Sequence, residues 1–132
     1  MIFHGTVVLI IGLVAGVPYG QAIARGGEAR AAEAWRAAHT GMCATGVMML
    51  AMGAALYAWG TPGATAHAVT WAVAIGSYSI ALAMTLAAAT GERGLRLGGS
   101  RTNTVVFLAY QIGVVGTFVG VITFLWLAWR HY

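Results

Sequence analysis

Long runs without any charged side chain dominate the pattern of hydrophobic and polar positions in this chain. They cover Ile2 to Ala24, Ala37 to Gly91 and Thr102 to Trp129. A membrane-spanning helix needs about 20 apolar residues, so the first and last runs fit one span each and the middle run fits two. Gly60-Thr61-Pro62-Gly63 is a turn sequence that divides the middle run. The pattern predicts an all-α membrane protein, a single domain over residues 1–132 that forms an antiparallel four-transmembrane-helix bundle, with helices at about 2–24, 37–59, 64–90 and 102–129.

The composition agrees with this class. The chain is 60% hydrophobic and only 8% charged, whereas about a quarter of the residues of a soluble domain are charged. The single cysteine, Cys43, excludes an internal disulfide and a metal site built from several cysteines. No Lys or Arg precedes the first apolar run, so we expect this run to be a retained helix rather than a cleaved signal peptide.

The arginines are distributed unevenly between the connections. Two connections, at 25–36 and 91–101, hold all but one of them: Arg25, Arg30, Arg36, Arg93, Arg96 and Arg101. Only Arg130 falls on the opposite side. Under the positive-inside rule, both connections are cytoplasmic and both termini lie outside. We expect a multi-pass protein of a bacterial-type inner (cytoplasmic) membrane, and we interpret the net positive charge as topology rather than nucleic-acid binding.

His39 is the first candidate functional residue, because it lies just inside the boundary of the second predicted helix. Imidazole is the commonest metal ligand in proteins, and an ionisable side chain within a span is a candidate functional site. The alternative is an interfacial histidine bonded to water or to a carbonyl group. Trp35, one turn earlier, is either an interfacial anchor or a cover for the ring. Gly46 and Gly53 share the face of His39 and either pack against a helix or leave room for a flat cofactor.

The other histidines do not complete a site with His39. An antiparallel bundle places His4, His67 and His131 at the outer boundary, about 30 Å from His39 across the hydrocarbon. A tetrahedral zinc site, which needs three or four convergent ligands, is therefore not expected. A haem needs one axial histidine, an apolar slot and cations for its propionates. The chain offers His39, the face of Gly46 and Gly53, and three arginines at the same membrane level, Arg36, Arg93 and Arg96.

The segment Glu33-x-Trp35-x-x-x-His39-Thr40-Gly41-x-x-x-x-Gly46 resembles the second transmembrane helix of the styrene oxide isomerase family. His4-Gly5 and Arg93-Gly94-Leu95 match further family landmarks. The resemblance implies a homotrimer of four-helix subunits and haem b bound through the histidine that matches His39. It also implies that ferric iron acts as a Lewis acid on a small apolar substrate, an aryl epoxide, and gives the aldehyde without net redox change. The expected haem contacts are Trp35, Arg36, Gly46, Arg93 and Arg96, and the expected catalytic pocket residues are Thr45, Tyr78 and Met84.

Three positions depart from the family pattern. The asparagine six residues after the haem histidine is Thr45 here, the helix-three aspartate is Gly76, and the helix-three tyrosine is Met84. Thr45 can still donate a hydrogen bond, but Met84 cannot. One alternative is therefore a haem-binding electron-transfer or sensory protein with His39 and Met84 as the two axial ligands. A second alternative is a cofactor-free membrane scaffold subunit.

Overall fold

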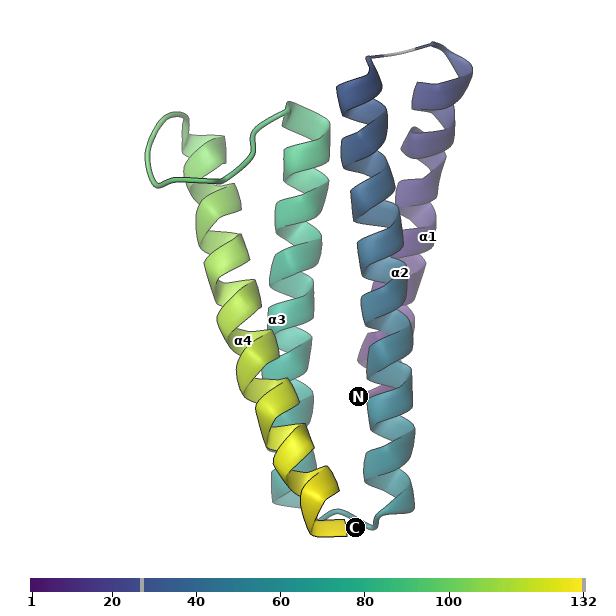
Figure 1. Ribbon diagram of the computed structural model, residues 1–132, viewed down its shortest axis with the longest axis vertical. Helices are drawn as coiled ribbons and strands as arrows, with labels where there is room; N and C mark the ends of the chain where they lie inside the picture. Colours follow the sequence, from purple (N-terminus) through teal and green to yellow (C-terminus); the bar gives the residue numbers. More distant parts are fainter. Residues whose placement is uncertain (27, 132) are drawn as a thin grey trace.

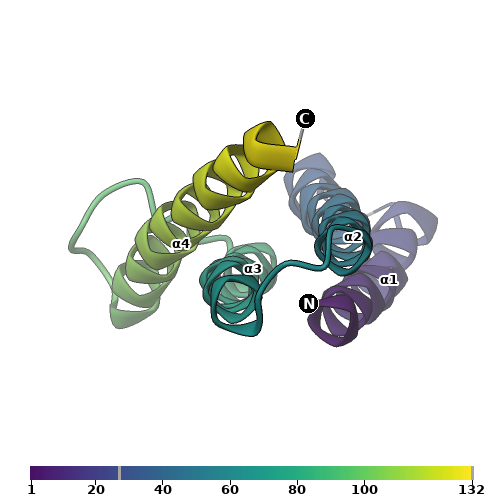
Figure 2. The ribbon, with the colours of Figure 1, turned by 90° about the horizontal axis from the view of Figure 1, so that it is seen from below.

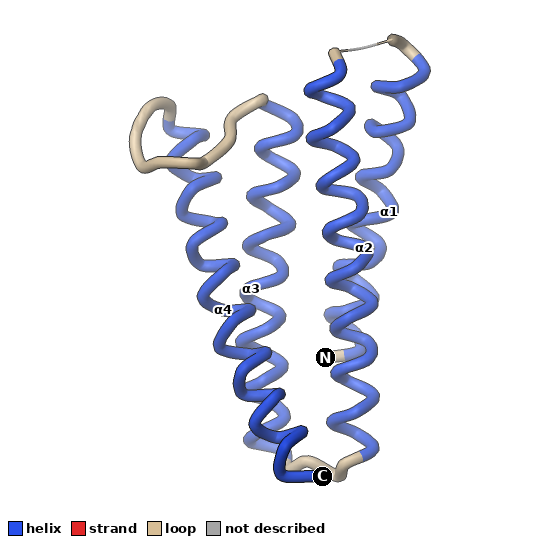
Figure 3. The backbone as a smooth tube through the Cα atoms, viewed as in Figure 1, coloured by secondary structure: helices blue, strands red, loops and turns tan. Residues whose placement is uncertain are grey.

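The computed structural model describes residues 1–26 and 28–131, and these form four long helices (Figure 1). They are α1 (Ile2–Ala24), α2 (Ala29–Ala58), α3 (Gly63–Thr90) and α4 (Arg101–His131). All four are long and apolar enough to span a membrane. Consecutive helices are antiparallel, and their connections lie at the two ends of the bundle (Figure 3). This confirms the predicted all-α fold of a multi-pass membrane protein.

The helix ends follow local sequence. The turn Gly60 to Pro62 separates α2 from α3, with Gly60 at φ +59° and Pro62 at the N-cap of α3. Gly91 ends α3 in the left-handed conformation, at φ +76°. The predicted start of the second helix is wrong, since α2 begins at Ala29 rather than near residue 37. The segment before Ala37 is rich in Ala, Glu and Arg, which favour helix without being apolar, so the helix extends beyond the hydrophobic run.

The helices pair as two hairpins, α1 with α2 and α3 with α4, and glycines bring each pair into close contact. In the α1/α2 hairpin, a Cβ on Gly12 would lie 2.7 Å from the Cys43 amide nitrogen. A Cβ on Gly46 would lie 2.7 Å from the amide nitrogen of Leu9. The space beside Gly46, which we expected a flat cofactor to use, is therefore occupied by the backbone of α1.

The α3/α4 hairpin closes in the same way. A Cβ on Gly76 would lie 2.6 Å from the amide nitrogen of Thr117, and one on Gly116 would lie 3.0 Å from the carbonyl oxygen of Ala72. Gly113 and Gly120 meet the side chains of Ile80 and Val73. Gly76 thus serves the packing of α3 on α4.

The two hairpins meet through α2 and α3, with α1 and α4 on the outside (Figure 2). Their shared core contains larger side chains than the hairpin contacts, including Met42, Met49, Val69 and Val73. Among the described residues, one hydrogen bond joins α1 to α3, between His4 Nδ1 and the Tyr78 hydroxyl at 3.1 Å. The interface between the hairpins therefore depends mainly on apolar packing.

His4 does not lie at the outer boundary as we expected. Its partner Tyr78 is near the middle of α3, and the adjacent Gly5 packs on Met49, well inside α2. The Phe3 and Trp71 rings lie 5.5 and 5.2 Å from the His4 ring. Helix α1 therefore begins deeper in the bundle than hydropathy suggests. The eight residues from His4 to Gly12, which contacts His39, correspond to about 12 Å of helix rather than a full membrane thickness.

Candidate functional site: the histidine between α1 and α2

The His39 ring is held against α1 by two glycines one turn apart. Its Nδ1 lies 2.8 Å from the carbonyl oxygen of Gly12. A Cβ on Gly16 would lie 3.1 Å from the same nitrogen and 3.3 Å from Cε1, so the absence of a side chain there makes room for the ring. At Gly12 and Gly46 the missing side chain admits backbone, whereas at Gly16 it admits an imidazole.

The hydrogen bond to Gly12 defines the protonation of the neutral ring. A carbonyl oxygen can only accept, so Nδ1 must carry the proton and Nε2 must carry the lone pair. Histidines that bind metals are commonly held in this form, with one ring N–H donated to a carbonyl group and the other nitrogen on the metal. His39 therefore satisfies both interpretations left open by the sequence: it is bonded to a carbonyl, and it still has one basic nitrogen for a ligand.

Two neighbouring side chains complete the surroundings of the ring. Tyr19, one turn after Gly16 on α1, lies nearly parallel to it, with ring centroids 6.4 Å apart and an interplanar angle of 22°. Cys43 Sγ is 3.9 Å from Nδ1, at the limit of a weak sulfur contact. His39 itself is half-buried. Within 1–26 and 28–131, no three His, Cys, Asp or Glu side chains converge as a metal site.

The predicted pocket residues are not gathered around this ring within one chain. Met84 reaches α2 at Gly41, where a Cβ would lie 3.1 Å from the methionine Cε, on the α3 side of α2. His39 faces α1 instead. The pairing of His39 and Met84 as two axial ligands of one iron therefore has no support in this arrangement. Tyr78 bonds to His4, and Thr45 is half-buried two turns after His39 on α2.

The predicted haem contacts divide into two groups. Trp35 and Arg36 precede His39 by about one turn on α2, with Trp35 packed against the core and Arg36 exposed. Arg93 and Arg96 lie in the connection between α3 and α4, where they line a cleft together with Arg30. This cleft is on the α3 side of α2, so the structure does not bring these two arginines to the His39 ring.

Sequence reasoning missed the α1 residues that hold His39. Gly12, Gly16 and Gly20 recur at four-residue spacing, which is typical of a helix-packing stripe. That interpretation is correct for Gly12 and Cys43 but incomplete for Gly16. At Gly20, the third member of the stripe, a Cβ would have no atom within 4 Å. A glycine stripe has the same spacing whether it faces backbone or an aromatic ring, so spacing alone does not identify the partner of Gly16.

Comparison with protein families gives a match over nearly the whole chain. The family model described as styrene oxide isomerase matches residues 1–129. No curated protein and no solved structure matches. The match includes His39, the glycines that hold it and all four helices.

Proposed function

We propose, since the chain belongs to the styrene oxide isomerase family, that it is a haem-b-dependent membrane isomerase that converts an aryl or other apolar epoxide to a carbonyl compound. His39 would bind the haem through Nε2. When bound, ferric haem supplies a Lewis acid for the epoxide oxygen. All other steps in the proposal concern what this chain does to hold the haem and the substrate.

One observation carries the proposal. The histidine in the family motif donates Nδ1–H to the carbonyl group of Gly12 and so keeps Nε2 basic. This bond and the space left by Gly16 together orient the ring on α1.

The surrounding sequence suits a rearrangement that uses no general acid or base. From Ala37 to Thr90 there is no Asp, Glu, Lys or Arg. Epoxide opening followed by a hydride shift moves hydrogen within the substrate, so no side chain has to exchange a proton with it. The apolar surroundings would bind an aryl group and exclude water that would otherwise convert the epoxide to a diol.

Some of the other predicted site residues have a role in this proposal and some do not. Trp35 and Arg36 lie next to His39 in sequence, and Arg36 is the proposed partner of a haem propionate. Thr45 is the proposed hydrogen-bond donor to a Lewis-basic substrate atom. Tyr78 bonds to His4 and Met84 packs against Gly41, so within one chain neither has a place at the His39 ring. Arg93 and Arg96 lie outside this site.

The membrane arrangement is part of the same proposal. The connections at 25–36 and 91–101 would face the cytoplasm of a bacterial-type inner membrane, with both termini outside, because these connections hold most of the arginines. The family resemblance implies a homotrimer. His39 is only half-buried in one chain, which leaves its outer side accessible to a haem or to a neighbouring subunit.

The test is conversion of styrene oxide to the aldehyde by protein purified in detergent with haem. We expect isomerisation by the ferric protein, loss of activity with added imidazole, which competes for the open iron position, and reduced activity for Thr45→Val. Thr40→Val is a matched control, because Thr40 bonds to its own helix at Arg36 and is exposed. A haem-loaded protein that resists imidazole and leaves epoxides unchanged would contradict the isomerase and favour electron transfer.

A further inference from the structure

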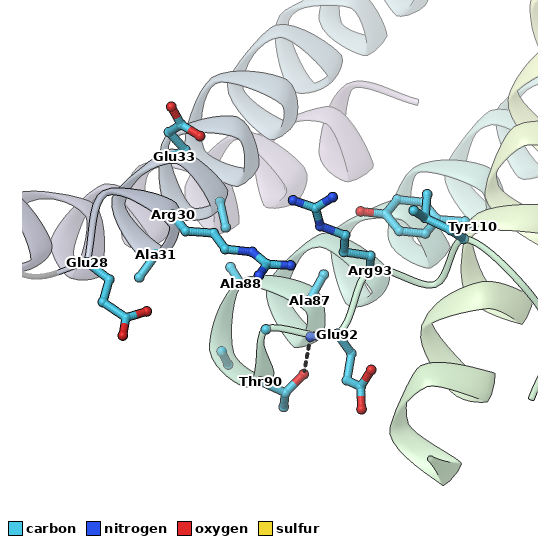
Figure 4. A pocket seen from close by; sticks show the side chains of 14 residues that line it. Glu28, Arg30, Ala31, Glu33, Ala87, Ala88, Thr90, Glu92, Arg93 and Tyr110 are labelled. Atoms are coloured by element: carbon cyan, nitrogen blue, oxygen red, sulfur yellow. Dashed lines mark hydrogen bonds between the residues drawn. The ribbon is translucent and has the colours of Figure 1, made fainter. Parts of the chain in front are cut away.

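A cleft opens at the end of the bundle that carries the connections α1–α2 and α3–α4. Its volume is about 720 Å³. Small side chains form its walls, Ala31 and Ala34 from α2 and Ala87 and Ala88 from α3, and Tyr110 of α4 also lines it. We call this the arginine cleft, because Arg30 and Arg93 enter it from opposite sides (Figure 4).

The charged side chains around the arginine cleft are arranged so that they favour the binding of an anion. In Figure 4 the side chains of Arg30 and Arg93 extend toward one another, whereas the carboxylates of Glu28, Glu33 and Glu92 extend away from them. Glu92 is engaged elsewhere, since its Oε1 accepts a hydrogen bond of 2.6 Å from the Ser100 hydroxyl. The two guanidinium groups therefore face the space of the cleft without a carboxylate between them.

The position of Arg93 is fixed by the connection that carries it. Gly94 is buried at φ +59°, and its N–H donates to Asn103 Oδ1 at 2.9 Å. A Cβ on Gly94 would lie 2.6 Å from Val106 Cγ1, so this part of the connection packs directly on α4. Asn103 Nδ2 also donates to the carbonyl groups of Arg96 and Gly98, at 3.0 and 2.7 Å. The backbone that carries Arg93 is therefore already ordered, and an anion has to order only the arginine side chain.

We propose that the arginine cleft binds the phosphate of an anionic phospholipid. It lies where the apolar spans end, next to Thr90 at the end of α3, and this is the level of lipid headgroups. Arginine pairs with phosphate through two parallel hydrogen bonds, and the Tyr110 hydroxyl is a further donor at the same cleft. The alanine walls and the exposed Leu95, at 77% exposure, provide apolar surface for the glycerol and upper acyl chains.

This inference goes beyond the isomerase proposal and does not depend on it. The cleft faces α3, whereas His39 faces α1, and lipid binding requires no haem. A lipid held between α2 and the α3–α4 connection would link the two hairpins at the end of the bundle where the alanine side chains leave a gap.

The experiment is native mass spectrometry of the detergent-purified full chain with phosphatidylglycerol or phosphatidylcholine of the same acyl chains. We expect tighter binding of phosphatidylglycerol. Near a membrane surface each arginine contributes a factor of about five to an anionic lipid's affinity, so Arg30→Gln with Arg93→Gln should weaken phosphatidylglycerol binding by about thirtyfold. Arg30→Lys with Arg93→Lys, which keeps the charge, should restore part of the affinity.

The matched control is Arg25→Gln with Arg101→Gln, because both side chains are exposed, lie at the same end of the bundle and are outside the arginine cleft. This variant should keep the affinity of the original chain. Equal binding of phosphatidylglycerol by the two double glutamine variants, with helical content unchanged, would overturn the proposal. Equal affinity for the two lipids, or displacement of the lipid by millimolar inorganic phosphate, would overturn it as well.

Discussion

Close contacts at glycines hold together both the α1/α2 and the α3/α4 hairpin, but the two hairpins differ in what one glycine faces. In both, glycines bring backbone to backbone, at Gly12 and Gly46 in one and at Gly76 and Gly116 in the other. In the α1/α2 hairpin, Gly16 faces the imidazole of His39, and Gly12 meets the sulfur of Cys43 as well as its backbone. Among the described residues of the α3/α4 hairpin, no glycine faces a histidine or cysteine side chain. One glycine of a packing stripe can thus make room for an aromatic ring while another brings two helices together.

The hairpins also differ in how their buried polar groups are satisfied. In the α1/α2 hairpin the imidazole of His39 has a carbonyl partner on the opposite helix. In the α3/α4 hairpin the buried hydroxyls of Ser77 and Thr117 have no partner among the described residues. Of these groups, only the His39 imidazole has a positioned hydrogen-bond partner of the kind that a cofactor ligand requires.

The largest effect should come from adding a methyl group where glycine meets backbone. Gly46→Ala and Gly76→Ala should each lower the free energy of unfolding by about 2 kcal/mol, because the backbone in contact has to move. Unfolding of detergent-solubilised protein by sodium dodecyl sulfate measures this. Gly20→Ala is the control, since nothing lies within 4 Å of its Cβ position, and helix propensity should make it slightly stabilising. Equal stability of all three variants would show that the hairpins are not closed in this way.

A smaller effect, confined to one hairpin, should follow from Gly16→Ala. The methyl group would displace the His39 ring and weaken its hydrogen bond to Gly12, and we expect haem affinity to fall by about tenfold. Titration of the apo-protein with haem measures it. Gly116→Ala is the matched variant in the α3/α4 hairpin and should reduce stability without changing haem affinity. The same loss of haem affinity in both variants would remove the distinction between the hairpins.

The smallest effect concerns the hydrogen bond between the hairpins. Tyr78→Phe removes the partner of His4 and should cost about 0.6 kcal/mol of stability, the usual value for such bonds within a membrane protein. The same unfolding assay applies. Tyr57→Phe, at a side chain that is 88% exposed, should cost nothing. A loss above that expected for one hydrogen bond would mean that His4 and Tyr78 take part in a larger polar network.

The number, order and direction of the helices could be predicted from the sequence, because apolar runs without charge have few other interpretations. Hydropathy alone does not give the start of α2, because it reports contact with lipid, whereas the segment from Ala29 is helical by propensity. The depth of α1 was also missed. Hydropathy gives the length of a span, but the contacts of Gly5 with Met49 and of Gly12 with Cys43 set its height against α2.

His39 can be chosen from the sequence as a candidate ligand, but its surroundings cannot. His39 was singled out by its position inside an apolar span and by the surrounding motif. The role of Gly46 was assigned incorrectly, because glycine leaves space but does not say what fills it, and here Leu9 does. The role of Gly16 and the bond from His39 to Gly12 depend on which faces of two helices meet, and this is a property of the folded chain.

The most direct test of the account is the absorption spectrum of the protein purified in detergent, compared with that of His39→Ala. We expect a haem b Soret band in the original chain. We expect His39→Ala to lose this band while it keeps the helical content of the original chain. A colourless original chain after expression with sufficient haem, or a variant that keeps the same haem spectrum, would contradict the assignment of His39 as the iron ligand.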